Sequence, residues 1–569
     1  MSRISTKRRS KQAIRFGRAI CSLFTRLSAP ARRGILIAAL IPVAVRILCF
    51  PWIPEPVPQI HDEFSNLLAA DTFAHGRLTN PAHPLWEFFE SIHVLQQPTY
   101  MSMYPIMQGL TLALGKVVFG HPWFAVLLSV GAMCGMACWM LQAWLPPAWA
   151  LLGALLMGLQ FGAGHYWTDS YWGGAVPATA GCLVLGAWGR LRRVRRIAAR
   201  CAFFGIALGV GVGMLANSRP WEGLLLCIPT AAAFLWWMIF AAAGTLKERL
   251  LRALAPCAAV LSLGAAFMMY NNWRVTGDAL KLPYVLNRET YAVAPVFLWE
   301  PGRPRPHYRH KVLEEFYTEW EPAFQGADTL PTLPGFVLPS LLKLKEVAKL
   351  AGGAVFVAPL VLLLVPLWRA PATRFLLLTS AVFCLGLMLQ RYALPHYLAP
   401  ILGALTAIKV AALRRLFHLR VRTRSPGWLI APLVIVTGAL LQLGDPGVTV
   451  PDCLQKHRPR ILERLQHEPG RHLVVVRYAS HHNLHCEWVY NEADIDEAPI
   501  VWAREMSPDH NRRLFDYYHD RRVWLLEADL EPPQLKSLSA PAPATGAQRL
   551  VPRAREQDWR TLTGTHGSG

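Results

Sequence analysis

The fold class is decided by two apolar segments that flank a basic loop. Residues 174–217 read GAVPATAGCLVLGAWG, then RLRRVRRIAAR, then CAFFGIALGVGVGMLAN. The two outer parts contain no charged residue, whereas the loop at residues 190–200 contains six arginines and no acid. A run of about 17–25 apolar residues crosses a bilayer core as a helix, and loops rich in Lys and Arg favour the cytoplasmic side. This stretch therefore predicts two membrane-spanning helices joined on the cytoplasmic face.

The rest of the chain has the same apolar character. Hydrophobic residues make up 53% of the 569 residues, charged residues only 17%, and the mean hydropathy is +0.27, whereas an ordinary globular chain is about 25% charged. These values argue against a disordered or fibrous protein and against a soluble enzyme, and they predict a polytopic α-helical membrane protein. About eleven transmembrane helices are expected, at residues 34–53, 123–144, 148–166, 174–189, 201–217, 222–243, 253–270, 350–368, 375–390, 394–413 and 427–443.

A twelfth candidate, residues 105–120, is short and begins with polar residues, so we expect an interfacial helix on the outer face. With this assignment the predicted cytoplasmic pieces hold 26 Lys and Arg but one acid, Glu248. If residues 105–120 crossed the membrane, the six arginines of residues 190–200 would face outward. The net charge of +22 is therefore mostly an orientation signal, with a cytoplasmic N-terminus and an outer C-terminus. No motif indicates a nucleic-acid partner.

This topology divides the chain into four regions. A basic cytoplasmic N-terminus (1–33) precedes a transmembrane domain (34–443) with two long outer loops, 54–122 and 271–349. A small extracytoplasmic α/β domain is expected at 444–531, with strands at 473–478, 500–503 and 523–527 and a helix at 508–519. The tail, 532–569, is rich in Pro, Ala, Gly and Thr and is expected to be disordered. In the outer C-terminal region Cys453 and Cys486 either pair or stay free.

Acidic residues stand at the outer ends of the predicted spans. Residues 59–66 read QIHDEFSN, in which Asp62 and Glu63 either start a helix, with Asp62 as its cap, or supply a catalytic carboxylate. Residues 165–174 read HYWTDSYWGG and place Asp169 among four aromatic rings. Such a segment is typical of an interfacial aromatic belt, but a lone carboxylate in an apolar rim is often functional.

Arginines stand at the same boundary. Residues 217–223 read NSRPWEG, in which Arg219 and Glu222 pair at a helix end on the simplest interpretation. Residues 391–397 read RYALPHY, in which Arg391 either extends to the interface or binds a phosphate. Acids and arginines at one outer interface suit a reaction on a lipid-linked phosphate substrate.

With these motifs in this order, the chain resembles the GT-C superfamily of membrane glycosyltransferases, in the branch of protein O-mannosyltransferases and lipid A aminoarabinose transferase. The resemblance covers residues 34–443. It rests on Asp62-Glu63 followed by AADTFAHGR at 69–77, on the segment 104–120, on RPWEG at 219–223, and on Arg391-Tyr392 with Pro395. Family members often carry Lys-Pro-Pro before the interfacial helix. Here Met103-Tyr104-Pro105 stands at that place, without the lysine.

The resemblance implies an enzyme that moves a sugar from a polyprenyl-phosphate donor to an acceptor on the outer face, with inversion. Asp62 would be the general base, and Glu63 would hold its loop or assist. Asp169 would be a second acidic residue for the acceptor or a divalent ion. The donor phosphate would be bound by Arg219, Arg391 and His396. Further residues expected to line the site are His61, Tyr104, Trp172, Glu222 and Tyr392.

The expected cofactors, partners and alternative classes complete this interpretation. A divalent cation, Mg²⁺ or Mn²⁺, on Asp62 and Asp169 stays an open alternative, and the histidines of the first outer loop lack a zinc spacing. The expected partners are the lipid-linked donor, a protein, lipid or glycan acceptor, and the bilayer of a bacterial inner membrane. A transporter or flippase is the alternative class, although no internal repeat is visible and the acids lie at the rim. A non-catalytic receptor or scaffold is the third.

Overall fold

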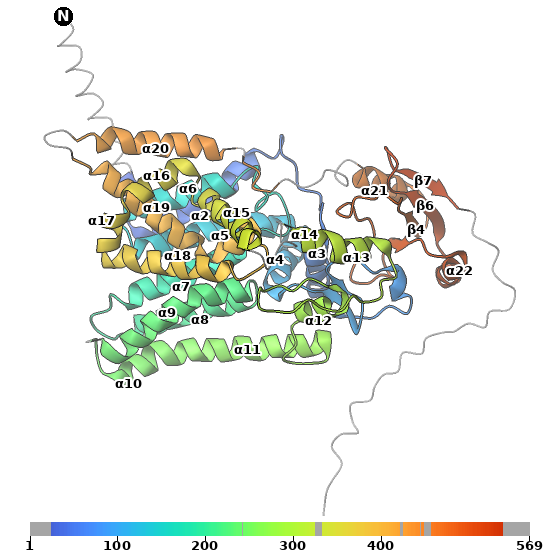
Figure 1. Cartoon of the computed structure of the whole chain (residues 1–569), viewed down its shortest axis with the longest axis horizontal. Coiled ribbons are helices and arrows are strands. Elements are labelled where there is room, and N and C mark those ends of the chain that lie inside the picture. The colour runs from blue at the N-terminus through green and yellow to red at the C-terminus, as the bar shows by residue number, and fades with distance from the viewer. Residues whose placement is uncertain are drawn as a thin grey trace, which may run out of the picture.

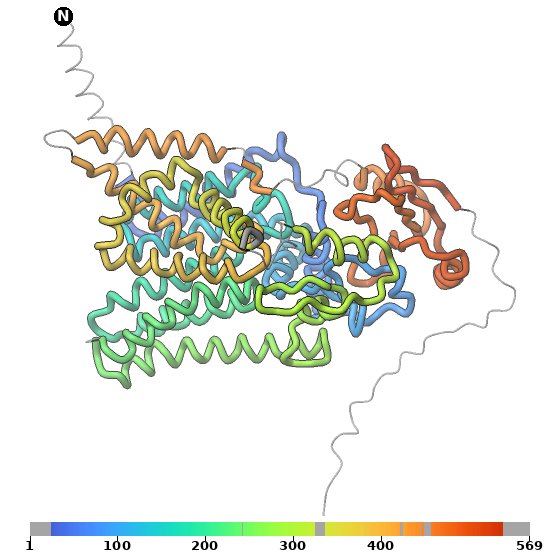
Figure 2. Tube along the Cα trace, in the orientation of Figure 1, coloured from blue at the N-terminus to red at the C-terminus, as the bar shows by residue number. Residues whose placement is uncertain are grey.

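The computed structural model describes residues 24–538, except residues 242, 325–332, 421–424, 444 and 449–456. A bundle of roughly parallel helices forms one end of the molecule, and a small α/β domain forms the other (Figure 1). The two long loops of the sequence lie between them, as the blue and yellow-green segments of the tube trace show (Figure 2). Most of the basic N-terminus and of the predicted disordered tail falls outside the described residues.

Each of the eleven apolar segments predicted from the sequence coincides with one helix or with two or three consecutive helical elements. The segment bounds are Ala31–Leu48 (α2), Trp123–Gln142 (α5), Pro147–Phe161 (α6), Ala175–Leu191 (α7), Ala199–Ala216 (α8), Pro220–Phe240 (α9), Leu246–Arg249 (α10) with Leu250–Leu254 (η2) and Ala255–Thr276 (α11), Ala354–Leu362 (α16) with Leu364–Arg369 (α17), Pro371–Leu387 (α18), Pro395–Ile401 (η5) with Leu402–Phe417 (α19), and Gly427–Gln442 (α20). In the described part of the chain, five helices are long and apolar enough to cross a membrane: α5, α8, α9, the continuous α10–α11 helix, and η5–α19.

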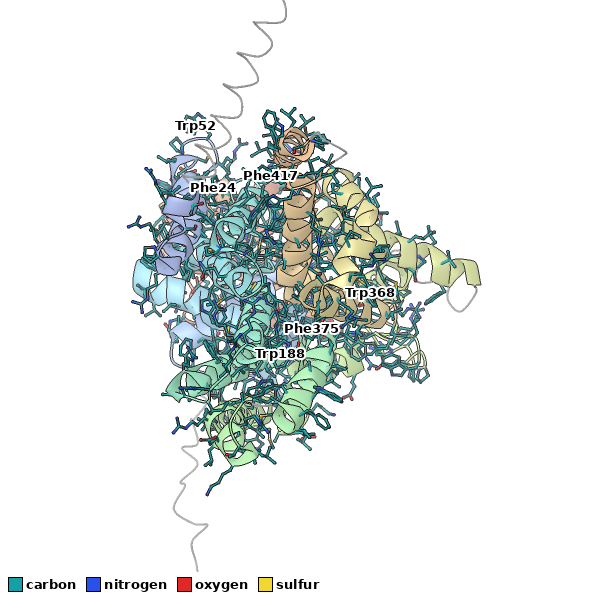
Figure 3. All side chains as sticks on the ribbon, turned by 90° about the vertical axis from the view of Figure 1, so that its left-hand side faces the viewer. Phe24, Trp52, Trp188, Trp368, Phe375 and Phe417 are labelled. Atoms are coloured by element: carbon teal, nitrogen blue, oxygen red, sulfur yellow. The ribbon has the colours of Figure 1, made fainter. Side chains whose placement is uncertain are left out.

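The bundle buries some aromatic side chains centrally and leaves large apolar side chains, both aliphatic and aromatic, exposed on its surface. Trp188 on α7 and Phe375 on α18 face one another near the middle of the bundle, with ring centres 6.2 Å apart (Figure 3). On the outer faces, Leu263 and Trp236 remain 73% and 67% exposed. Large apolar side chains that remain exposed along an apolar helix are typical of a surface in contact with lipid.

Close packing fixes the segment that carries His396 and Tyr397. Gly181 on α7 lies directly under η5, and a methyl group added at Gly181 would stand 2.0 Å from the carbonyl oxygen of Pro400. Only glycine permits two backbones to approach this closely. The contact holds η5 against α7 at the end of the bundle next to the two loops, where Tyr397 forms part of the cavity described below.

The first loop contains helix His61–Ala74 (α3), strands Asn80–Pro81 (β1), Val94–Leu95 (β2) and Thr99–Ser102 (β3), the short helix Trp86–Phe88 (η1), and helix Ile106–Phe119 (α4). The strands form an antiparallel sheet in the order β1-β3-β2. Helix α4 coincides with the predicted interfacial segment and packs on α3. The second loop contains Pro283–Tyr291 (α12), Lys311–Glu315 (α13), Phe316–Trp320 (η3), Glu321–Ala323 (α14) and Leu333–Leu350 (α15).

The C-terminal domain contains the three predicted strands and the predicted helix. Helix Arg458–His467 (α21) precedes His472–Arg477 (β4), Ile500–Arg504 (β5), Pro508–Tyr517 (α22) and Arg522–Glu527 (β6). A further strand, Gln534–Ser537 (β7), pairs antiparallel with β6, while β5, β4 and β6 run parallel in the order β5-β4-β6-β7. The expected boundary at residue 531 is therefore wrong, because the sheet continues into the segment that was expected to be disordered. Cys453 lies outside the described residues, and Cys486 is disulfide-bonded.

The domain is packed firmly on the first loop. Phe64 of α3 stacks on Tyr490, with ring centres 4.1 Å apart, and the Asp71 carboxylate accepts the backbone N–H of Ala493 at 2.7 Å. Phe64 and Tyr490 belong to one buried cluster that also contains the strands of the domain. The domain and the first loop therefore share a single hydrophobic core.

Candidate functional site

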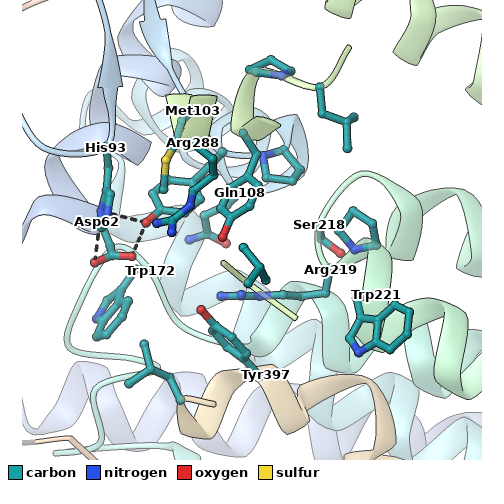
Figure 4. Close-up of a pocket in the computed structure, with 18 of the residues that line it drawn as sticks. Asp62, His93, Met103, Gln108, Trp172, Ser218, Arg219, Trp221, Arg288 and Tyr397 are labelled. Atoms are coloured by element: carbon teal, nitrogen blue, oxygen red, sulfur yellow. Dashed lines mark hydrogen bonds and ion pairs between the residues drawn. The ribbon is translucent and has the colours of Figure 1, made fainter. Parts of the chain in front are cut away.

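A cavity of about 800 Å³ lies where one end of the bundle meets both loops and the C-terminal domain. Seven of the residues expected from the sequence line it: His61, Asp62, Tyr104, Trp172, Arg219, Glu222 and Tyr392. Figure 4 shows Asp62 and His93 on one side of the cavity and Arg219 with Tyr397 on the other. Chain segments more than 300 residues apart thus converge on one space.

Asp62 is placed in the cavity wall by the start of α3. Ile60 is the residue that precedes the first helical residue, so the expectation that Asp62 caps the helix is wrong. Glu63 takes that role, because its carboxylate accepts the backbone N–H groups of Gln59 at 2.7 Å and Ile60 at 3.3 Å. The Asp62 carboxylate does not cap the helix and lies in the cavity wall instead. The positive end of the helix dipole favours its negative charge.

The Asp62 carboxylate is linked to a tyrosine and a histidine. The hydroxyl of Tyr104 donates a hydrogen bond to Asp62 Oδ1. His93 Nδ1 lies 2.9 Å from the same hydroxyl and 3.8 Å from Asp62 Oδ2. The Asp62 side chain is 20% exposed, so it remains accessible from the cavity. Sequence reasoning missed His93, which carried no motif of its own.

Glu63 is buried beside the cavity rather than in it. Its second oxygen accepts the backbone N–H of Tyr171 at 3.0 Å, so the carboxylate ties the start of α3 to the aromatic loop at residues 165–174. Burial raises the pKa of Glu63 to about 7, and the backbone N–H groups oppose this rise. Glu63 is not among the described residues that line the cavity.

Three arginines line the cavity, of which the sequence indicated one. Arg219 precedes the first residue of α9, and its guanidinium lies 4.2 Å from the ring centre of Tyr397. Arg288 on α12 forms a buried ion pair with Glu321, to which Tyr392 also donates a hydrogen bond at 3.1 Å. Arg303 lies in the loop after α12.

Two of these arginines retain unused donors. Within the described part of the chain, Arg288 Nε and Arg303 Nη1 are buried atoms without a hydrogen-bond partner. Buried N–H groups are normally paired, so each unpaired one requires an explanation, such as a ligand. The sequence identified neither residue, because neither the short helix α12 nor the loop that follows it carries a recognisable motif.

Three residues that were expected in the site lie outside the wall of the cavity. Asp169 accepts Arg46 Nε–H at 2.7 Å and the Gly164 backbone N–H at 2.8 Å, so its carboxylate is occupied. His396 is buried, with Nδ1 3.3 Å from the Tyr166 hydroxyl. Arg391 has its backbone N–H bonded to Val296 O at 3.0 Å. None of the three is among the described residues that line the cavity.

The fit of a divalent ion to Asp62 and Asp169 is poor. Both oxygens of Asp169 already accept hydrogen bonds from the protein, and only Asp62 of the two lines the cavity. In the part of the chain that the structure describes, no group of three or more His, Cys, Asp and Glu residues is arranged to hold a metal ion. We therefore derive no chemical step through a metal at these two residues.

The C-terminal domain supplies part of the cavity wall. His61 Nδ1 lies 2.6 Å from the hydroxyl of Tyr490, and His485 packs edge-on against Trp320 at 4.7 Å between ring centres. His485 follows β4, and loops after the carboxyl ends of parallel strands commonly carry function. No role for this domain was predicted from the sequence. The parallel strand order, which places the loop with His485 at the carboxyl end of β4, is not determined by the sequence alone.

Comparisons with known proteins show a resemblance at the level of structure. No protein-family model and no curated protein sequence matches the chain. Similar solved structures include the oligosaccharyltransferase of Archaeoglobus fulgidus with Zn and sulfate (14% identity, 78% of this chain and 60% of that one, TM-score 0.45). Another is the same organism's oligosaccharyltransferase AglB with an inhibitory peptide and a dolichol-phosphate (13%, 88% and 70%, TM-score 0.47).

A third similar structure is ArnT from Cupriavidus metallidurans bound to undecaprenyl phosphate, at 14% identity, over 86% of this chain and 92% of that chain, with a TM-score of 0.47. The chain spans 60–70% of the length of the two oligosaccharyltransferase chains.

Proposed function

We propose that this protein is a membrane glycosyltransferase that moves a sugar from a polyprenyl-phosphate donor to an acceptor. The observation that carries the proposal is one cavity, at the end of an apolar helical bundle, that joins the Asp62 carboxylate to Arg219, Arg288 and Arg303. A carboxylate suits a general base. Guanidinium groups suit a phosphate, which they bind bidentately and whose charge they stabilise.

The proposed reaction is a single displacement at the anomeric carbon. The acceptor hydroxyl or amine gives its proton to Asp62 as its oxygen or nitrogen bonds to the sugar. The bond between the sugar and the phosphate oxygen breaks, and the electron pair leaves with the lipid phosphate. Attack opposite the leaving group inverts the anomeric configuration. Arg219, Arg288 and Arg303 offset the charge that grows on the departing phosphate.

Apolar side chains make room for the isoprenoid end of the donor. Leu224 on α9, Met268 on α11 and Leu282 before α12 all line the cavity. Leu224 is 49% exposed, so it also forms part of the outer surface of the bundle. The cavity therefore extends from the arginines toward the surface that we assign to lipid.

We place the chain in a bacterial inner membrane with eleven crossings, a cytoplasmic N-terminus and a periplasmic C-terminal domain. The basic loops support this orientation, because Lys and Arg in short loops favour the cytoplasm. With it, α4 is an interfacial helix, and the cavity opens at the outer face beside the C-terminal domain. The acceptor then reaches Asp62 from the periplasm while the donor stays in the bilayer.

The test is turnover with defined donors. Purified protein in nanodiscs is incubated with undecaprenyl-phosphate and dolichol-phosphate sugars, because these lipid phosphates occur in the ArnT and AglB structures. The expected result is release of lipid phosphate and transfer of labelled sugar. Asp62→Asn is expected to lower kcat by about 100-fold or more, the usual contribution of a general base. The matched control, Asp516→Asn, changes an exposed carboxylate of α22.

Wild-type turnover by Asp62→Asn would remove the general-base assignment. A transporter or flippase would instead move labelled lipid across sealed vesicles without cleaving any glycosidic bond. Movement of intact donor across vesicles, together with no release of lipid phosphate from any donor in the panel, would overturn the glycosyltransferase proposal.

A further inference from the structure

The backbone of His93 adopts a conformation that side chains rarely take. Its φ angle is +65°, and it is the one non-glycine residue with positive φ among those that the structure describes. The carbonyl oxygen of His93 accepts hydrogen bonds from Ser65 Oγ at 2.7 Å and from the backbone N–H of Met103 at 3.2 Å. Such strained residues persist only where the surroundings impose them, and they cluster at functional sites.

This conformation directs the imidazole into the cavity. His93 Nδ1 lies 2.9 Å from the Tyr104 hydroxyl, and that hydroxyl donates to Asp62. A hydroxyl has a single hydrogen. Since Tyr104 uses it on Asp62, the contact with His93 requires that Nδ1–H donates to the tyrosine oxygen. The three side chains therefore form one directed chain, from His93 through Tyr104 to Asp62.

The surroundings of His93 favour the neutral imidazole. Burial lowers the pKa of His93, while Asp62 and Glu321 act to raise it and Arg288 acts to lower it. Its neighbours also include the rings of Phe316, at 5.6 Å and edge-on, and His61, at 6.0 Å, together with His485 and Tyr317. A neutral imidazole carries one N–H and one lone pair, so its donor is available for Tyr104.

We propose that His93 is a positioning residue, which fixes the Tyr104 hydroxyl so that this hydroxyl orients the Asp62 carboxylate toward the acceptor. The inference rests on the proposed function, because it assigns how Asp62 is held during transfer. His93 itself touches neither the sugar nor the phosphate in this role. Its strained backbone places the donor atom where Tyr104 needs it.

The test compares two substitutions that both tolerate positive φ. His93→Gly removes the imidazole and relieves the backbone strain. His93→Asn also accepts this conformation and retains an N–H donor on the atom bonded to Cγ, close to the place of Nδ1. Asparagine has no proton to exchange near neutral pH, so it separates positioning from proton transfer by the imidazole.

The expected result is a split between stability, binding and turnover. His93→Gly should unfold at a temperature equal to or above that of the wild type and should bind undecaprenyl phosphate with unchanged affinity. Its kcat should fall by about 100-fold, the cost of misplacing a reacting group by about 1 Å. His93→Asn should recover at least about 10-fold of that loss. In Tyr104→Phe, the further change His93→Gly should have no additional effect on kcat, because the chain is already broken.

Three outcomes would overturn the inference. One is a His93→Gly variant with wild-type kcat. Another is a glycine variant that loses stability and kcat together, which indicates a structural role. The third is a His93→Asn variant as inactive as the glycine variant, which indicates that the imidazole itself exchanges a proton. A wild-type protein that releases lipid phosphate from none of the donors would instead count against the proposed function itself.

Discussion

Replacement of Asp169 by asparagine should cost stability rather than catalysis. Asp169 accepts Arg46 Nε–H at 2.7 Å, and the side chain of Arg46 is completely buried. The same guanidinium donates to the carbonyl oxygens of Ile53 at 2.7 Å and Pro54 at 2.8 Å, and it lies 4.7 Å from the ring centre of Trp123. Asp169 is the only carboxylate bonded to this cation in the described contacts.

The magnitude follows from what Asp169→Asn leaves behind. Removing one partner of a buried ion pair costs about 3–5 kcal/mol, because the other charge remains buried and uncompensated. The amide oxygen of asparagine can still accept from Arg46, but its amide nitrogen then faces the Gly164 N–H, which now bonds Asp169 Oδ2 at 2.8 Å. Since the Asp169 side chain is only 18% exposed, solvent gives little relief. We expect a loss of about 3 kcal/mol in the free energy of unfolding.

The assay is denaturant unfolding in detergent, with kcat and undecaprenyl-phosphate affinity measured on the folded fraction. Asp169→Asn should unfold at lower denaturant concentration and keep both functional values. Asp516→Asn, at an exposed position on α22, is the matched control and should change neither stability nor function. An Asp169→Asn protein with wild-type stability but without turnover would refute the structural role of Asp169. That result would indicate a catalytic role instead.

Three further predictions concern pH, the arginines and topology. Because burial raises the pKa of Glu63 from 4.5 to about 7, its stabilising contribution is present below pH 4.5 and lost as pH rises through 7. Wild type should lose about 3 kcal/mol of unfolding free energy over this range, and equal slopes in wild type and Glu63→Gln would contradict it. Arg303→Ala should weaken binding of undecaprenyl phosphate by about 10-fold, whereas Arg391→Ala should leave the affinity unchanged. Weaker binding by Arg391→Ala together with unchanged binding by Arg303→Ala would refute the assignment of the phosphate to the cavity. Tags at Arg195 and Asp529 should be accessible from opposite sides of sealed vesicles, and accessibility from one side would refute the orientation.

Helices and strands that depend only on residues close together in the chain were predictable from the sequence. Long apolar runs produced the helices of the bundle, since a helix satisfies its own backbone hydrogen bonds. The strands β4, β5 and β6 followed from short apolar runs bounded by polar residues. Strand β7 was missed because QLKS at 534–537 is too short and polar to indicate a strand. Its pairing with β6 is a tertiary contact.

Site residues were predictable only where a local motif marked them. Asp62 and Arg219 stand at helix starts near predicted spans, so their sequence neighbours place them at the ends of those spans. Arg288 and Arg303 come from a loop whose path into the cavity depends on contacts with the bundle and the first loop. His93 becomes notable only through its positive φ and its distance to Tyr104. Neither quantity can be read from the chain.

The sequence could not separate the three acids, because their roles depend on how many donors each carboxylate already satisfies. Glu63 accepts three backbone N–H groups, and Asp169 accepts one guanidinium and one backbone N–H. Asp62 accepts the Tyr104 hydroxyl on one oxygen, and its carboxylate lies in the cavity wall. A carboxylate whose lone pairs are occupied by the protein cannot take a proton from a substrate without breaking those bonds. Substitutions of Glu63 and Asp169 should therefore change the free energy of unfolding, and substitution of Asp62 should change kcat.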